Sequence, residues 1–163
     1  MKKFNFDLQI GLTEETRVFV CNQLTIILSD QYVLFTKLFK YHWNVKGQNF
    51  GPLHALFEKG YRMMFDDVDE TAERIVQLGF QTPATLKEFL TFSRLEEHPG
   101  INPIAEDMIL FLVNDFQSII IQIRECINLT DSTYRDMGTN NFLTDLIQKY
   151  EKYVWLLRSH IEK

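Results

Sequence analysis

The sequence predicts an all-α protein, a four-helix bundle with a short helix in the long crossover between the second and third long helices. Apolar residues recur at helical spacing in four segments of roughly 20–28 residues, and no segment of useful length alternates with the period of a strand. The seven glycines and four prolines are few and not clustered, which favours long, uninterrupted helices. Helices of this length form a bundle more readily than any other arrangement.

The length and charge of the chain limit the class of protein. We expect one domain over residues 1–163, with a flexible N-terminal tail over residues 1–12. A hydrophobic content of 45% and a charged content of 24% are typical of a globular protein. The net charge of −5, with Lys2 and Lys3 as the only basic tail, argues against a surface that binds polyanions in general.

The cysteines and the distribution of polar residues bear on the cellular compartment in which the protein lies. Cys21 and Cys126 each lie in an apolar helical stretch, so we expect buried free thiols in a reducing environment. The N-terminal residues lack the apolar run of a secretory signal. Asp115 and Arg124 interrupt the most apolar stretch, so we predict no membrane-spanning segment. We therefore expect a soluble, cytoplasmic protein with no membrane partner.

The first long helix is predicted over about residues 13–41. Thr13 can cap its N-terminus, and Glu14 and Glu15 suit the positive end of the helix dipole. The turn through residues 44–47 ends it. Its expected core positions share one apolar stripe: Val18, Leu24, Ile27, Leu28, Leu34, Phe35 and Leu38.

The second long helix is predicted over about residues 51–78. Pro52 fits a first-turn position, and Gly79 ends the helix. Gly60 lies in the middle, where glycine costs about 1 kcal/mol relative to alanine. It indicates either close helix packing or a neutral exposed position. The expected core positions are Leu53, Leu56, Phe57, Met64, Val68, Ile75 and Val76.

The remaining helices are predicted from residues that cap or interrupt a helix. A short helix is predicted over residues 83–89 with Thr82 as its cap, followed by a polar linker over residues 93–100. The third long helix starts at residues 102–103 and runs to about residue 129, and the fourth covers about residues 141–161. A long crossover between the second and third helices is the ferritin-like arrangement rather than the simple up-down one.

Four residues of the second helix belong to types that bind metals: His54, Glu58, Asp69 and Glu73. At about 100° per residue they fall near 0°, 40°, 60° and 100°, on one helical face. His54 and Asp69 nevertheless lie roughly 22 Å apart along the axis, too far for a single ion. The pairs 54 with 73 and 58 with 69 share one midpoint, so an antiparallel copy of the helix would complete two metal sites per dimer.

A fifth ligand candidate, His42, ends the first helix, and the turn after it can bring it beside His54. Two imidazoles and three carboxylates suit Fe(II), Mn(II) or Zn(II), and the lack of cysteine ligands argues against a structural zinc site. Taken alone, each carboxylate pair is more often a solvated helix surface, and a lone histidine is more often a surface residue. What raises the metal site above these alternatives is the joint placement of the four residues of the second helix, which share one face and form two pairs with one midpoint.

A metal centre inside a single subunit is not predicted. The standard di-iron bundle needs a Glu-x-x-His motif on each of two helices, and the sequence contains none. The third and fourth long helices offer few ligands, so we expect an apolar bundle centre, with the metal chemistry on the outside of the second helix.

The ligand segment resembles the signature of the Dps family of miniferritins. The resemblance is carried by the run from His42 to Gly47, by His54 with Glu58, and by Asp69 followed by Ala72-Glu73-Arg74. It extends over most of the chain, including the short crossover helix, the 76–79 exit from the second helix and the region of Trp155.

The resemblance implies a hollow dodecamer of four-helix subunits, built from two-fold dimers. It implies a ferroxidase site across each dimer interface, with His42, His54 and Glu58 from one subunit and Asp69 and Glu73 from its partner. Members oxidise Fe(II), usually with hydrogen peroxide, and store Fe(III) as a mineral core. Trp43, next to the first histidine, would then lie close to the site.

The sequence also departs from the family pattern. Many members carry Asp where this chain has Glu58, which bears on a second, weaker iron position. The start of the fourth helix, 136–141, carries amides where pore-lining acids are common, so we expect reduced pore charge. Lys2 and Lys3 form a shorter basic tail than that of the DNA-binding members, so DNA is expected to be at most a weak partner.

Three functions therefore stay open at this stage. The first is a ferroxidase and iron store that protects against oxidative damage, with Asp66, Asp67 and Glu70 as candidates for mineral nucleation. The second is a DNA-compacting protein in which iron binding is secondary. The third is a structural protein whose His, Asp and Glu residues form only interface salt bridges.

Overall fold

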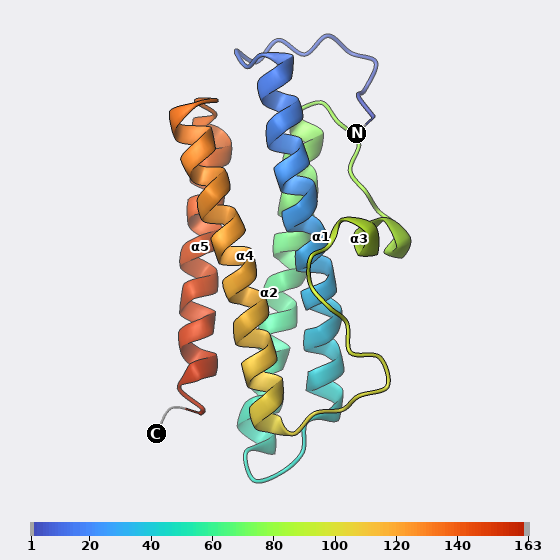
Figure 1. The fold of residues 1–163 in the computed structure, drawn as a ribbon, viewed down its shortest axis with the longest axis vertical. Helices are drawn as coiled ribbons and strands as arrows, with labels where there is room; N and C mark the ends of the chain where they lie inside the picture. Colours follow the sequence, from blue (N-terminus) through green and yellow to red (C-terminus); the bar gives the residue numbers. More distant parts are fainter. Residues whose placement is uncertain (1, 162–163) are drawn as a thin grey trace.

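The computed structural model describes residues 2–161 and contains five α-helices (Figure 1). They are α1 (Glu14–Asn44), α2 (Phe50–Gln77), α3 (Leu86–Phe92), α4 (Ala105–Ser132) and α5 (Met137–Arg158). Within the described residues the only β feature is an isolated bridge between Lys3 and Phe80. The prediction of an all-α bundle with a short crossover helix is confirmed.

The connections explain the arrangement of the four long helices. Short turns join α1 to α2 and α4 to α5, so each pair packs as an antiparallel hairpin (Figure 1). The segment between α2 and α4 carries α3 past the side of α1 and returns to the end of the bundle where α2 began (Figure 1). As a result α2 and α4 run in the same direction, as in ferritin-like topology.

A buried carboxylate anchors this crossover. Asp30 on α1 is fully buried and accepts hydrogen bonds from the Ser93 hydroxyl at 2.9 Å and from the Arg94 backbone N–H at 2.7 Å. The guanidinium of Arg94 also donates to it, with Nε at 2.9 Å. Because a buried charge is tolerated only when it is paired and hydrogen-bonded, these contacts fix where the chain leaves α3.

Three helices begin at places that the sequence analysis did not predict. Helix α4 begins at Ala105 rather than at residues 102–103, with Ile104 as its N-cap residue. Helix α5 begins at Met137 rather than near residue 141, because the Asp136 side chain accepts from the backbone N–H of Thr139 and caps the helix. Helix α3 begins at Leu86 rather than at residue 83, because Thr85 and Glu88 form a reciprocal capping box in place of the expected cap at Thr82.

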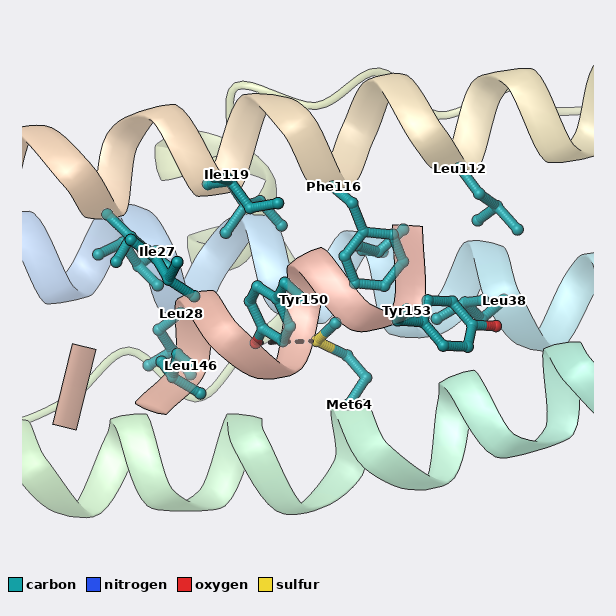
Figure 2. Packing of buried hydrophobic residues seen from close by; sticks show 14 of the residues in the cluster. Ile27, Leu28, Leu38, Met64, Leu112, Phe116, Ile119, Leu146, Tyr150 and Tyr153 are labelled. Carbon is teal, nitrogen blue, oxygen red and sulfur yellow. Dashed lines mark hydrogen bonds between the residues drawn. The ribbon is translucent and has the colours of Figure 1, made fainter. Parts of the chain in front are cut away.

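The core follows the predicted stripes with two exceptions. Val18 is 37% exposed and Val76 is 45% exposed, so their expected burial is wrong. Val18 lies about 200° around α1 from the buried Val20, and Val76 about 100° around α2 from the buried Ile75. The other expected positions on α1 and α2 are buried or half-buried. Their side chains meet those of α4 and α5 along the bundle axis (Figure 2).

Close packing accounts for Gly60. A Cβ at this position would lie 2.2 Å from Tyr153 Oη and 2.9 Å from Leu38 Cδ2. Tyr153 is itself buried and donates from its hydroxyl to the Leu56 carbonyl at 2.9 Å. Of the two alternatives that the sequence left open, the structure supports close helix packing.

The bundle centre is not wholly apolar, which corrects one prediction. Asp67 is fully buried there and pairs with the Lys149 ammonium, although burial raises the pKa of its carboxyl. Nearby, Gln31 donates to Tyr150 Oη at 2.8 Å, and that hydroxyl donates to Met64 Sδ at 3.7 Å (Figure 2). Because Asp67 lies inside the bundle, it is no candidate for a mineral-nucleating surface.

The N-terminal residues lie against the end of α2. The Phe4 N–H donates to the Gly79 carbonyl at 3.0 Å, and the Gln81 N–H donates to the Lys2 carbonyl at 2.8 Å. The Lys3 ammonium pairs with Glu14. The expected flexibility of residues 1–12 stays a prediction, and Met1 lies outside the described residues.

Helix α1 and the cysteines bear on the predicted compartment. By length and composition alone α1 could cross a membrane, but 61% of its most apolar window is buried inside the bundle, as in the core helix of a soluble bundle. Cys21 and Cys126 are buried free thiols, as predicted.

Candidate metal centre

The first two candidate ligands lie side by side where α1 ends and α2 begins. The turn over residues 45–49 brings His42 and His54 together with ring centroids 3.7 Å apart and planes 23° apart. Each ring Nδ1 lies 2.8 Å from the backbone carbonyl oxygen of the other histidine. His42 is 9% exposed and His54 is half-buried, so the pair is partly shielded from water.

This reciprocal pairing sets the protonation pattern of both rings. A carbonyl oxygen can only accept, so each Nδ1 must carry the proton and donate. In the neutral ring the lone pair is then on Nε2, and the other nitrogen is held by a backbone carbonyl in the way typical of metal-binding histidines. The arrangement leaves both Nε2 atoms without a hydrogen-bonded proton, which is the form in which a histidine can bind a metal.

Aromatic side chains surround the two imidazoles. Tyr61 meets His42 edge-on with centroids 5.3 Å apart and stacks on Phe39 at 4.1 Å. Trp43 is 69% exposed and lies 5.1 Å from Phe39. The expected position of Trp43 close to the metal site stays a prediction. The sequence analysis did not single out Tyr61. It lies four residues before Phe65, and this spacing places both aromatic rings on one face of α2.

Glu58, one turn after His54 on α2, is the nearest candidate carboxylate in sequence. Both Nε and Nη2 of Arg62 donate to its Oε1, at 2.9 Å and 2.7 Å. The hydrogen bond from Arg62 is the main reason that the pKa of Glu58 is lowered, so the carboxylate is anionic near neutral pH. Sequence reasoning missed Arg62, although Glu and Arg four residues apart on a helix are a recognisable ion-pair spacing.

The last two candidates, Asp69 and Glu73, are exposed further along α2. The structure does not bring them to the histidines, since roughly 22 Å of helix separates His54 from Asp69. Among the described residues of one subunit, no three His, Cys, Asp or Glu side chains gather closely enough to hold a metal ion. The single chain therefore presents two separate parts of the proposed ligand set, and their union across a two-fold axis stays a prediction.

The start of α5, residues 136–141, was expected to bear on pore charge. Its acid, Asp136, is 3% exposed and accepts hydrogen bonds from Thr139 and from Arg74 Nη2, the latter at 3.1 Å. Asp136 therefore serves as a helix cap and ion-pair partner, and its charge is not available to line a pore.

Comparison with known proteins gives the family. The Ferritin-like domain family matches residues 21–163. An uncharacterised low-temperature-induced protein of Nostoc sp. is 39% identical over 95% of this chain and 87% of its own length. DNA protection during starvation protein 2 of Bacillus anthracis is 32% identical over 83% of this chain and 92% of its own length.

Comparison with solved structures supports the same family. The Dps protein of Vibrio cholerae O1, described as a member of a broad superfamily of ferritin-like diiron-carboxylate proteins, superposes with a TM-score of 0.90 at 29% identity. The alignment covers 95% of this chain and 96% of that structure. The bundle with its long crossover, the paired histidines and these matches together show that the chain belongs to the Dps family of ferritin-like proteins.

Proposed function

We propose that this chain is a miniferritin that oxidises Fe(II), with hydrogen peroxide as oxidant, at sites between subunits and stores Fe(III) as a mineral inside a hollow dodecamer. Family membership supports an iron-binding role. The observation that carries the proposal is the pair of histidines whose Nδ1–H groups are both bound to backbone carbonyls, with the anionic Glu58 one turn further along α2. In this role iron is the substrate, and the sites protect the cell from oxidative damage.

The site requires a second copy of the chain. If a two-fold axis passes near Met63 and Met64, an antiparallel α2 places the partner copy of residue 69 near Glu58 and the partner copy of residue 73 near His54. The intervening surface suits such a contact, because Phe65 is 63% exposed on it. Two hollows of about 350 Å³ and 340 Å³ flank Phe65 and are lined largely by aromatic and aliphatic side chains.

The ligand types fit the proposed reaction. Three carboxylates and two neutral imidazoles stabilise Fe(III) more than Fe(II), because the higher charge gains more from anionic ligands. Two Fe(II) ions each lose one electron, and one hydrogen peroxide takes both electrons and two protons to give two waters. Paired electron transfer releases no hydroxyl radical. Asp66 and Glu70 are exposed and stay candidates for nucleation of the mineral.

Complementation between two inactive variants tests the shared site. In a mixed dimer of His54→Ala and Asp69→Ala protomers, one site carries both substitutions and the other carries neither. Each homogeneous variant should fail to oxidise Fe(II), whereas random co-assembly should restore about a quarter of the wild-type rate, since half the dimers are mixed and each has one intact site. Light scattering verifies that every sample assembles.

The result also separates the competing readings. If the mixture stays as inactive as its parents, the ligands are not shared between subunits. If the homogeneous variants retain full activity, the residues form only interface contacts, as in the structural reading. A mixture of His54→Ala with His42→Ala protomers is the matched control, because both lose ligands from the same half and no intact site can form.

DNA compaction is the alternative function and has less support. The relative from Bacillus anthracis is named for DNA protection, but the present chain has a net charge of −5, and Lys3 in its short basic tail pairs with Glu14. Phosphate contacts make such binding sensitive to salt. A gel shift at low and moderate salt tests it, and the absence of any shift at low salt removes this alternative. Our proposal places the protein in the cytoplasm, where buried free thiols stay reduced.

A further inference from the structure

A small recess lies between α1 and the linker that leads from α3 to α4. The linker runs beside α1 (Figure 1), and its residues 97–99 face a wall of α1 that includes Lys37, Lys40 and Tyr41. This linker recess has a volume of about 150 Å³. The Lys40 ammonium donates to the backbone carbonyl of His98 and so ties the linker to α1. Because a water molecule takes up about 30 Å³ in the liquid, the recess has room for a polyatomic ligand.

Two polar atoms in the walls of the linker recess lack a partner. Tyr41 is fully buried, and within residues 2–161 neither its Oη nor the buried Nδ1 of His98 has a hydrogen-bond partner. The His98 ring packs edge-on against Phe111 with centroids 4.6 Å apart, and the Tyr41 ring packs against Phe57 at 6.3 Å. Because buried polar groups in native proteins are nearly always hydrogen-bonded, these two atoms indicate a ligand of the recess.

The charges around the linker recess favour an anion. The Lys37 ammonium is balanced by the Asp115 carboxylate of α4, 2.5 Å away. The Lys40 ammonium instead meets a backbone carbonyl, and no carboxylate of the described residues pairs with it. Glu97 also lines the recess, but it is exposed, so water screens its charge. A cation would be repelled by Lys40, and water alone would leave the charge of Lys40 unbalanced.

We propose that the linker recess binds a small inorganic oxyanion of the size of phosphate, held by the Lys40 ammonium, the Tyr41 hydroxyl and the Nδ1–H of His98. A tyrosine hydroxyl has an ordinary pKa of about 10, and burial raises that of Tyr41 further, so this hydroxyl keeps its proton and can donate. A histidine can carry its proton on Nδ1 in the neutral ring as well as in the cation. An oxyanion offers several acceptor oxygens, so one molecule can accept from all three groups in charge-assisted hydrogen bonds.

The bound anion would join α1 to the linker, because two of its donors belong to the helix and the third to the linker. This site is separate from the proposed iron site, and the inference does not depend on the proposed function. Its expected effect is on the linker: saturating phosphate should slow hydrogen exchange of the backbone amides in residues 97–101, since an additional set of contacts must break before the linker opens.

Equilibrium dialysis of radiolabelled inorganic phosphate against the assembled, metal-free protein at constant ionic strength tests the inference. The wild type should take up one phosphate per chain with a saturable isotherm. Tyr41→Phe deletes a hydroxyl with no partner among the described residues, so it should weaken phosphate binding at least about fivefold yet leave Tm in phosphate-free buffer unchanged or raised. Lys40→Gln should also weaken binding, because it removes the unbalanced charge. The matched control is Tyr134→Phe, which removes a half-buried hydroxyl near the start of α5 and should leave the isotherm unchanged.

The competing anions define the ligand class. Sulfate, which has the same tetrahedral shape, should displace phosphate, whereas chloride at the same ionic strength should not. Displacement by chloride as effective as that by sulfate would refute an oxyanion site. Uptake that does not saturate, or that is equal in the wild type and Tyr41→Phe, would show that the recess holds only water. Phosphate that binds without slowing exchange of residues 97–101 in the wild type would place it elsewhere on the protein and overturn the assignment.

Discussion

Replacement of Gly60 by alanine tests the packing that holds α2, the helix with most of the proposed ligands, against α5. A new Cβ would lie 2.2 Å from Tyr153 Oη and 2.7 Å from Tyr153 Cζ, well inside contact distance. Tyr153 cannot turn aside freely, because its ring is buried and its hydroxyl donates to Leu56. Either the two helices separate or this hydrogen bond breaks.

The expected cost follows from three opposing contributions. Overpacking of a core costs about 1–3 kcal/mol, and loss of a hydrogen bond costs about 1 kcal/mol. Alanine recovers about 1 kcal/mol in a helix relative to glycine. We therefore expect Gly60→Ala to lower the free energy of unfolding by about 1–3 kcal/mol, or Tm by roughly 2–12 °C for a chain of this length.

Urea and thermal unfolding at fixed protomer concentration provide the assay, because the proposed assembly would make stability depend on concentration. Gly51→Ala is the matched control, because Gly51 lies exposed in the first turn of α2 and a Cβ there meets nothing within 4 Å. It should be neutral or slightly stabilising. Adding Tyr153→Phe to Gly60→Ala should recover part of the loss. A Gly60→Ala protein as stable as the wild type would refute the packing argument.

Two further predictions concern the thiols and the crossover helix. Burial raises the pKa of Cys21 and of Cys126 to about 12, so neither thiol should react with a disulfide reagent at pH 8 until urea unfolds the protein. Reaction of either thiol in the folded protein would contradict this. Thr85→Ala removes half of the α3 capping box and should weaken hydrogen-exchange protection of residues 86–92 by about 1 kcal/mol. The pKa of Glu88 is lowered by its hydrogen bonds from Thr85 and the Ala84 N–H, so this support is present at neutral pH and is lost as pH falls through the lowered pKa. Unchanged protection in the variant would show that tertiary contacts alone hold α3.

The sequence predicted the parts of the molecule that depend on local pattern. The four long helices follow from apolar periodicity, and the proximity of His42 to His54 follows from a turn of a few residues. The start of α5 was placed too late, because Gly138 and two asparagines are weak helix formers, and the cap at Asp136 overrides them.

Features that depend on distant partners could not be predicted from pattern. Asp66 and Asp67 are adjacent and chemically identical, yet Asp66 is exposed and Asp67 is fully buried. Asp67 falls on the buried stripe of α2 between Met64 and Thr71, whereas Asp66 lies about 100° away. What no local pattern shows is the partner that makes a buried carboxylate tolerable, Lys149, 82 residues further along the chain. The protonation pattern of the paired histidines likewise depends on two backbone carbonyls, which no side-chain pattern records.

The hydrogen bond from each imidazole to a backbone carbonyl has a consequence for substitutions at this pair. Each ring is tethered to the main chain of the opposite helix, and no side-chain substitution removes a main-chain oxygen. The loss of one imidazole therefore leaves the tether of the other intact. A protein built in this way can lose one of the two rings while the other keeps its orientation.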